Sequence, residues 1–353
     1  MLKVGVIGCG YWGPNLIRNF YKQHNVKLVA VADKDPTRLG FVVNNYPTVK
    51  IYDDATFLTT DPEIEAVVIA TPVATHFPLA LAALEAGKHV FVEKPLAPTV
   101  AECDVLIAEA DKRNLTLYTD HVFVHTTAVR KIRELIDRGD IGDLYYFDST
   151  RINLGLFQSD VNVMWDLAVH DLSILNYLTP QRPVAVSAIA HQHMPGCQEY
   201  MAVINLFYES AFAAHISVNW MSPVKVRKTL IGGSKKMIVY DDIEPSQKVM
   251  VYEKGVDTEN TPAASNKVRI SYRTGDVWGP KIDPDEALDR SAAHFVDCVL
   301  TGKTPITDGR NGRDVVRVLE AAMTSVASGG KRIDLVKQPL KARETSTATR
   351  RAG

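Results

Sequence analysis

A carboxylate and an imidazole four residues apart are the first residues in this chain that could do chemistry. They are Asp166 and His170, in the segment Trp165–Asp171. If the segment is helical, the two side chains share one face. A carboxylate beside an imidazole can fix the ring's tautomer and raise its basicity, as a general base requires. The alternative is an i,i+4 pair on a solvated helix face, and the spacing alone does not decide between them.

A lysine at the end of a predicted strand is the second candidate. Lys94 stands in Glu93-Lys94-Pro95, directly after the apolar run His89–Val92. Ligands of a parallel sheet bind beyond the carboxyl ends of its strands. A cation there could stabilise negative charge that develops on a reacting oxygen. The alternative is a surface lysine before a turn.

The stretch Val4–Asp33 indicates what would react there. It contains Gly8-Cys9-Gly10-Tyr11-Trp12-Gly13, a G-x-G-x-x-G spacing between a β-branched run and a helix-length segment. The first glycine makes a tight turn, the second admits a pyrophosphate, and the third lets the helix pack closely. The helix N-terminus then faces the phosphates. A plain glycine-rich turn can share this spacing, but the full strand–turn–helix–strand order favours a dinucleotide.

Asp33 ends the second strand of this unit, twenty residues after Gly13. An acid at this place accepts hydrogen bonds from the adenosine ribose hydroxyls and repels a 2′-phosphate. The sequence therefore predicts NAD as the cofactor rather than NADP. Lys34 and Arg38 lie nearby and weaken that preference.

The elements that must position these residues alternate between strands and helices up to about Asp120. That rhythm predicts a parallel doubly wound sheet with Thr71, Lys94 and Asp120 at its carboxyl edge. We expect an α/β protein with a Rossmann dinucleotide-binding domain over residues 1–121. Short strands with few helices then predict an α+β domain over residues 122–335. Residues 336–353 are polar and without pattern, which predicts a flexible tail.

The composition excludes several classes of function. The formal net charge of −1 offers no basic excess for a nucleic-acid backbone, and no apolar run is long enough for a membrane span. The four cysteines are widely spaced and form no C-x-x-C pair, which favours reduced thiols in the cytoplasm. The N-terminus has no signal-peptide pattern. His191 and His193 are interpreted as ordinary sheet positions, so no metal is expected.

Together these motifs resemble a known family. Gly8–Gly13, Asp33, Thr71-Pro72 with His76, Glu93-Lys94-Pro95 and Asp166-x-x-x-His170 follow the order seen in the glucose-fructose oxidoreductase/inositol dehydrogenase/MocA family. The resemblance covers about residues 2 to 335. It implies a second domain built on a large open, mostly antiparallel sheet, with a nicotinamide held between the domains. It also implies oxidation or reduction of a secondary alcohol on a sugar or cyclitol.

The resemblance assigns roles to individual residues. It implies that Lys94 is the catalytic lysine, that His170 is the acid/base, and that Asp166 contacts the substrate. It also leads us to expect a cis peptide bond between Lys94 and Pro95. The expected cofactor contacts are Gly8, Gly10, Tyr11, Trp12, Gly13, Asp33, Lys34, Arg38, Thr71, Pro72, His76, Glu93 and Lys94.

The segment from Arg151 to Gly155, running on to Trp165-Asp166, resembles the branch that acts on nucleotide-activated sugars. That branch includes UDP-N-acetylglucosamine 3-dehydrogenases and UDP-N-acetylglucosaminuronate dehydrogenases. Arg151 and Asn153 are the expected substrate contacts, since a guanidinium binds a diphosphate or a carboxylate bidentately. A salt bridge at the end of a strand is the alternative role for Arg151.

The expected activity is therefore NAD-dependent oxidation at C3 of a UDP-linked sugar such as UDP-N-acetylglucosamine. The alternatives are a UDP-N-acetylglucosaminuronate 3-dehydrogenase, a free inositol or aldose dehydrogenase, and a non-enzymatic regulator that binds a dinucleotide. A homodimer or homotetramer is expected, because the second sheet has helices on one side only.

Overall fold

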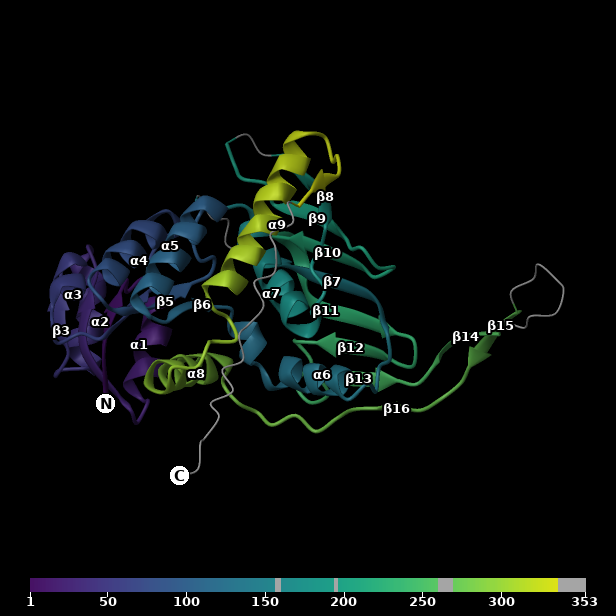
Figure 1. Cartoon of the computed structure of the whole chain (residues 1–353), viewed down its shortest axis with the longest axis horizontal. Helices are drawn as coiled ribbons and strands as arrows, with labels where there is room; N and C mark the ends of the chain where they lie inside the picture. Colours follow the sequence, from purple (N-terminus) through teal and green to yellow (C-terminus); the bar gives the residue numbers. More distant parts are fainter. Residues whose placement is uncertain (156–159, 194–195, 260–268, 336–353) are drawn as a thin grey trace, which may run out of the picture.

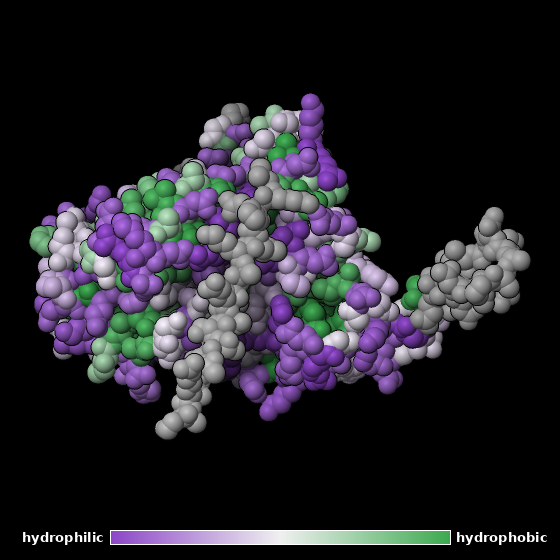
Figure 2. All heavy atoms as spheres, in the orientation of Figure 1, coloured by the Kyte–Doolittle hydropathy of each residue, from purple (hydrophilic) through white to green (hydrophobic). Residues whose placement is uncertain are grey.

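The computed structural model of the chain describes residues 1–155, 160–193, 196–259 and 269–335. The expected tail, residues 336–353, lies outside them. Two sheets stand side by side, with helices on and between them (Figure 1). Figure 2 shows hydrophilic residues interspersed with hydrophobic ones over both lobes. Within the described residues, no helix is both long and apolar enough to cross a membrane.

The first sheet has six parallel strands in the order β3-β2-β1-β4-β5-β6, the doubly wound arrangement that the sequence predicts. Its strands are β1 (Leu2–Ile7), β2 (Val26–Ala32), β3 (Lys50–Tyr52), β4 (Ala66–Ile69), β5 (His89–Glu93) and β6 (Leu117–Asp120). Its helices are α1 (Gly13–Tyr21), α2 (Pro36–Asn45), α3 (Thr56–Thr60), the 3₁₀ turn η1 (Val73–Thr75), α4 (His76–Glu85) and α5 (Val100–Arg113). The strands are apolar on both faces because helices cover both.

The second sheet is nine-stranded in the order β16-β13-β12-β11-β7-β10-β9-β8-β17. All pairs are antiparallel except β7 with β10, so the predicted mostly antiparallel sheet is confirmed. Its strands are β7 (Leu144–Leu154), β8 (Ala185–His191), β9 (Met201–Phe207), β10 (Ala213–Asn219), β11 (Met221–Gly233), β12 (Met237–Asp241), β13 (Val249–Tyr252), β16 (Val277–Trp278) and β17 (Ile333–Asp334). A separate hairpin, β14 (Gly255–Glu259) with β15 (Arg269–Arg273), extends away from the body (Figure 1).

The remaining helices join the two sheets. They are the 3₁₀ turn η2 (Val122–His125), α6 (Thr127–Asp137), the π-helix η3 (Met164–Ala168), α7 (Val169–Leu178), α8 (Ala287–Thr301) and α9 (Gly309–Ala327). The sequence places α8 in the second domain, but in the structure it packs on α1 of the first. Phe295 of α8 meets Phe20 and Phe91 edge to face, at ring-centroid distances of 6.0 and 5.5 Å. The chain therefore returns to complete the core of its N-terminal domain.

Candidate active site

One cavity of about 1650 Å³ runs along the carboxyl edge of the first sheet and meets β7, β11, η3 and α7 of the second domain. Most of the residues that the sequence singles out line it. They are Gly8, Gly10, Tyr11, Trp12, Asp33, Lys34, Arg38, Thr71, Pro72, Glu93, Lys94, Asn153, Asp166 and His170. Gly13, His76 and Arg151 are not among the lining residues.

The glycine turn has the shape that a pyrophosphate needs. Gly8 has a φ of +99°, and a Cβ there would overlap the carbonyl oxygen of Ala70. A Cβ on Gly13 would strike the carbonyl oxygen of Gly8, so this glycine allows close helix packing and does not itself reach the cavity. Gly10 is open toward the cavity, with only the tip of Arg38 near. No side chain caps the N-terminus of α1. These features fit the phosphates of a dinucleotide.

Asp33 connects the end of β2 to the glycine turn. Its Oδ2 accepts a hydrogen bond of 2.6 Å from the backbone N–H of Cys9, and its Oδ1 accepts one of 2.9 Å from Asp35. Arg38 Nη1 lies 3.9 Å from the same carboxylate. Asp33 can therefore hold the turn in place as well as accept from a ribose hydroxyl.

His76 lies behind the cavity and is almost fully buried. Its Nδ1 is 2.7 Å from the carbonyl oxygen of Pro95, and its Nε2 is 2.8 Å from that of Thr71. Burial lowers the pKa of this imidazole. His76 thus joins the two strand-end loops that carry Thr71 and Lys94, and it positions them from outside the cavity. The Lys94–Pro95 peptide bond is cis, as the resemblance led us to expect.

Lys94 and Asp166 form an ion pair across the cavity. Lys94 Nζ lies 3.0 Å from Asp166 Oδ1 and donates to the backbone oxygen of Asp166 at 2.9 Å. Asp166 Oδ2 accepts from Trp220 Nε1 at 3.1 Å. The ammonium group is therefore held at the cavity wall by a residue of the second domain.

The expected contact between Asp166 and His170 is wrong in this structure. Asp166 lies in the π-helix η3, and His170 lies in the first turn of the following helix α7. The Asp166 carboxylate bonds Lys94 and Trp220, and His170 Nδ1 is buried with no hydrogen-bond partner in the described residues.

His170 is nevertheless a neutral imidazole in the cavity wall. Burial lowers its pKa well below the usual value, and the nearby charges of Lys94 and Arg151 lower it further. The imidazole is therefore neutral at pH 7, and its ring meets Phe123 at a centroid distance of 4.8 Å. A neutral imidazole next to a cation can take a proton from a bound hydroxyl.

Arg151 is not among the residues that line the cavity. It forms a salt bridge, which is the alternative role that the sequence left open for it. Its Nε and Nη2 bond both carboxylate oxygens of Asp171, at 2.9 and 3.1 Å, and the pair is buried. The arginine that the second domain contributes to the cavity wall is Arg227, directly opposite Arg151 on β11. The sequence does not single out Arg227, because only the pairing of β7 with β11 brings it to the site.

Glu93 and Asp120 form a second polar group that the sequence does not predict as a pair. Both are buried in the cavity wall. Asp120 Oδ1 accepts from Ser291 Oγ at 2.6 Å, and Ser291 Oγ lies 2.9 Å from Tyr118 Oη. Tyr118 Oη is in turn 2.7 Å from His125 Nε2. Burial raises the pKa of Asp120 to about 6 and, together with Asp120 itself, raises the pKa of Glu93 well above its usual range.

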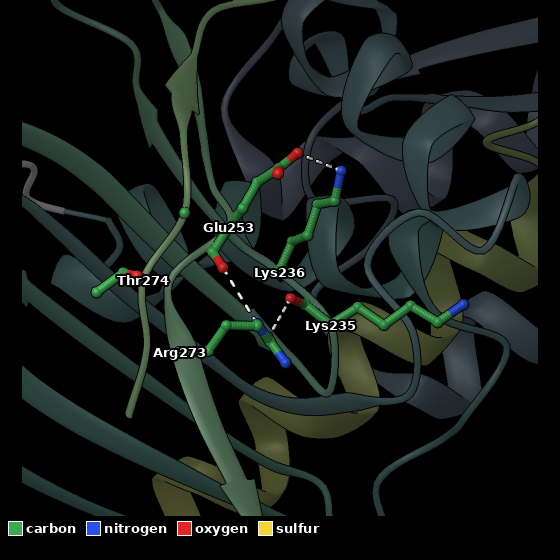
Figure 3. Close-up of a pocket in the computed structure, with 6 residues that line it drawn as sticks. Lys235, Lys236, Glu253, Arg273 and Thr274 are labelled. Carbon is green, nitrogen blue, oxygen red and sulfur yellow. Dashed lines mark hydrogen bonds and ion pairs between the residues drawn. The ribbon is translucent and has the colours of Figure 1, made fainter. Parts of the chain in front are cut away.

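A smaller cavity of about 290 Å³ lies at the base of the β14–β15 hairpin (Figure 3). Three of its charged side chains have partners within the chain: Lys236 pairs with Glu253 at 2.6 Å, and Arg273 donates to the backbone oxygens of Glu253 and Lys235. These bonds hold the hairpin to the sheet. Across the residues that the structure describes, no cluster of three or more His, Cys, Asp or Glu could hold a metal ion.

Comparison with known proteins agrees with this geometry. Residues 2–121 match the oxidoreductase family with an NAD-binding Rossmann fold, and residues 129–239 match the GFO/IDH/MocA C-terminal domain. A 1-carboxy-3-chloro-3,4-dihydroxycyclohexa-1,5-diene dehydrogenase of Comamonas testosteroni is 30% identical over 53% of this chain and 50% of its own. This chain therefore spans about half of that relative. The scyllo-inositol 2-dehydrogenase (NAD(+)) of Bacillus subtilis is 24% identical over 93% of this chain and 95% of its own.

Among solved structures, the UDP-N-acetylglucosamine 3-dehydrogenase of Acidithiobacillus ferrooxidans aligns with a TM-score of 0.77 and 23% identity. The match covers 92% of this chain and 98% of that one, and it shows a shared fold. Two consecutive domain matches, on a structure with the same two sheets, settle the family. The chain belongs to the GFO/IDH/MocA oxidoreductase family, with an NAD-binding Rossmann domain followed by the family's C-terminal domain.

Proposed function

We propose that this protein is an NAD-dependent dehydrogenase that oxidises a ring secondary alcohol, at C3 of a UDP-linked sugar such as UDP-N-acetylglucosamine, to the 3-keto sugar. One observation carries the proposal. Lys94 and His170, from different domains, line the same cavity as the glycine turn and Asp33. A regulator that only binds a dinucleotide would need the turn and Asp33, but not a neutral imidazole and an oriented ammonium group.

The residues of the chain divide the work of alcohol oxidation. His170 is neutral and would take the hydroxyl proton. Lys94 would hold the same oxygen and stabilise the negative charge that develops on it. Asp166 orients the ammonium group through its bond to Nζ. NAD, when bound, supplies the hydride acceptor. The glycine turn, the uncapped start of α1 and Asp33 would hold it along the sheet edge.

The substrate part of the proposal has its own support. The segment from Arg151 to Asp166 resembles the nucleotide-sugar branch of the family, and the cavity of about 1650 Å³ leaves room for a large substrate beside a dinucleotide. The fold match to a UDP-N-acetylglucosamine 3-dehydrogenase is compatible with this substrate. A UDP-N-acetylglucosaminuronate and a free inositol or aldose are the alternatives.

The test is the appearance of reduced nicotinamide when UDP-N-acetylglucosamine and NAD are added to wild type and His170→Ala. Removing a positioned acid/base should lower turnover by about 10²–10⁴. NAD affinity should stay nearly unchanged, because the cofactor contacts lie on the first domain. His215→Ala is a matched control, since His215 is an exposed histidine on β10. Near-normal turnover by His170→Ala would discard the mechanism, and activity on free inositol without activity on any UDP-sugar would discard the substrate alone.

A further inference from the structure

Arg227 is a cation of the cavity wall that the proposed mechanism does not use. Its side chain is 29% exposed and lies on β11. Nη1 is 3.3 Å from Asp242 Oδ2, and Nε is buried without a hydrogen-bond partner in the described residues. The Cζ atom lies 5.8 Å from the centre of the Phe123 ring. The guanidinium is therefore half-buried and only partly hydrogen-bonded.

The ion pairs of Arg151 and Arg227 differ, and only the charge of Arg227 is incompletely balanced. Arg151 is the register partner of Arg227 and packs 4.5 Å from the centre of the same Phe123 ring. Arg151 has both oxygens of Asp171 for its own ion pair. Asp242, in contrast, serves two cations, because Lys248 Nζ lies 3.7 Å from its Oδ1. Arg227 and Lys248 thus share one carboxylate, and Arg227 lies at the cavity wall where it could also pair with a bound anion.

Arg227 also stands close to the reacting groups. Its Cζ and the His170 ring lie 5.8 and 4.8 Å from the centre of the same Phe123 ring, and all three residues line the cavity. An anion bound by Arg227 would therefore sit near the carbon that is oxidised, and a substituent of the ring itself fits this position better than a diphosphate further along the substrate. Asn153, on the same wall, has a buried Oδ1 without a partner in the described residues. That oxygen could accept from a ring hydroxyl.

We propose that Arg227 binds a carboxylate carried by the sugar ring, so that among UDP-linked sugars the protein prefers a sugar acid over a neutral hexosamine. A guanidinium fork and a carboxylate match in geometry and charge. This inference rests on the function proposed above for the same cavity, and it narrows the substrate within it. Binding of the carboxylate removes the charge imbalance left by the shared Asp242.

The experiment compares kcat/KM for UDP-N-acetylglucosaminuronate and UDP-N-acetylglucosamine in wild type, Arg227→Gln and Arg227→Lys. A charge-assisted hydrogen-bond pair is worth about 1.5–3 kcal/mol, which corresponds to roughly 10–100-fold. Wild type should therefore prefer the acid by about that factor. Arg227→Gln should lose this preference, mainly through a higher KM for the acid. Arg227→Lys should restore part of it. Lys228→Gln is the matched control, because Lys228 is the next residue and pairs with Asp241 at 3.1 Å.

The outcomes separate this proposal from the proposed function. If Arg227→Gln lowered kcat/KM equally for both sugars, or did not lower it for the acid, the role of Arg227 would be overturned. The proposed dehydrogenase activity would be unaffected. If free glucuronate were turned over in a way that depends on Arg227, and no UDP-sugar were, the substrate would carry no nucleotide. The role of Arg227 in binding the carboxylate would be retained. Titration calorimetry of both UDP-sugars into the protein with NADH gives the same comparison without turnover. Binding of the acid that Arg227→Gln leaves intact would also overturn the proposal.

Discussion

Glu93 and Asp120 are register partners at the ends of the neighbouring parallel strands β5 and β6, and both carboxyl groups are buried. Two carboxylates side by side in a desolvated site cannot both ionise, so the pair holds a proton at neutral pH. Ser291 donates to Asp120, which favours the ionised form there. Glu93, next to Lys94, is then the neutral member.

The pair should make stability depend on pH. Because burial raises both pKa values, its stabilising contribution is fully present below the ordinary carboxyl pKa of about 4 and is lost as pH rises through about 6. Asp120→Asn keeps the acceptor for Ser291 and removes one charge. The free energy of unfolding, measured with urea at several pH values, should fall between pH 5 and pH 8 in wild type. In Asp120→Asn this fall should be smaller by roughly 1–3 kcal/mol. The exposed Asp283→Asn should behave as wild type, and equal slopes in all three proteins would contradict the shared proton.

Loss of the ion pair between Lys94 and Asp166 should lower kcat more than it lowers the affinity for the cofactor. Lys94→Ala should lower kcat by about 10²–10³, because it removes charge stabilisation at the reacting oxygen. Asp166→Asn should cost less, on the order of tenfold, since the backbone oxygen of Asp166 still accepts from Nζ. Stopped-flow measurement of hydride transfer, alongside NADH affinity, distinguishes the two effects. A larger loss in Asp166→Asn than in Lys94→Ala would show that Asp166 does more than orient the lysine.

Asp33 should decide between NAD and NADP while also holding the glycine turn. Asp33→Ala removes the acceptor for the Cys9 N–H and should therefore weaken binding of both cofactors. The ratio of NADH to NADPH affinity should fall about tenfold or more, because repulsion of the 2′-phosphate is lost and Arg38 remains close. Fluorescence titration measures both affinities. Asp61→Ala, which removes a loop carboxylate outside the cavity, should leave the ratio unchanged. Equal affinity for the two cofactors in wild type would exclude this role.

The open face of the second sheet should join two copies of the chain. Helices pack on one face, while Ile189 and Val203, register partners on β8 and β9, are 56% and 43% exposed on the other. We expect a homodimer or homotetramer in sedimentation, and Val203→Lys should shift it toward the monomer, because a charge on this apolar face opposes burial. A wild-type species of only 39.0 kDa at micromolar concentration would refute this contact.

The first domain could be predicted because its signals are local. The glycine turn and Asp33 lie within one strand–turn–helix–strand unit, and Lys94 follows its strand directly. The residues that the sequence misses depend on contacts between distant segments. Arg227 reaches the cavity only because β11 pairs with β7, and Ser291 meets Asp120 across 171 positions of the chain. The sequence pointed to Asp166 but not to its partners, because Lys94 and Trp220 come from segments 72 and 54 positions away along the chain.

The packing of α8 on α1 has a consequence for synthesis of the chain. The surface of α1 that Phe295 covers belongs to a domain whose own segment ends near residue 121. The ribosome must add roughly 180 more residues before α8 is complete, which takes about 10–40 s at 5–20 residues per second. During that interval the nascent N-terminal domain carries an uncovered aromatic surface around Phe20, which is prone to aggregation until α8 docks.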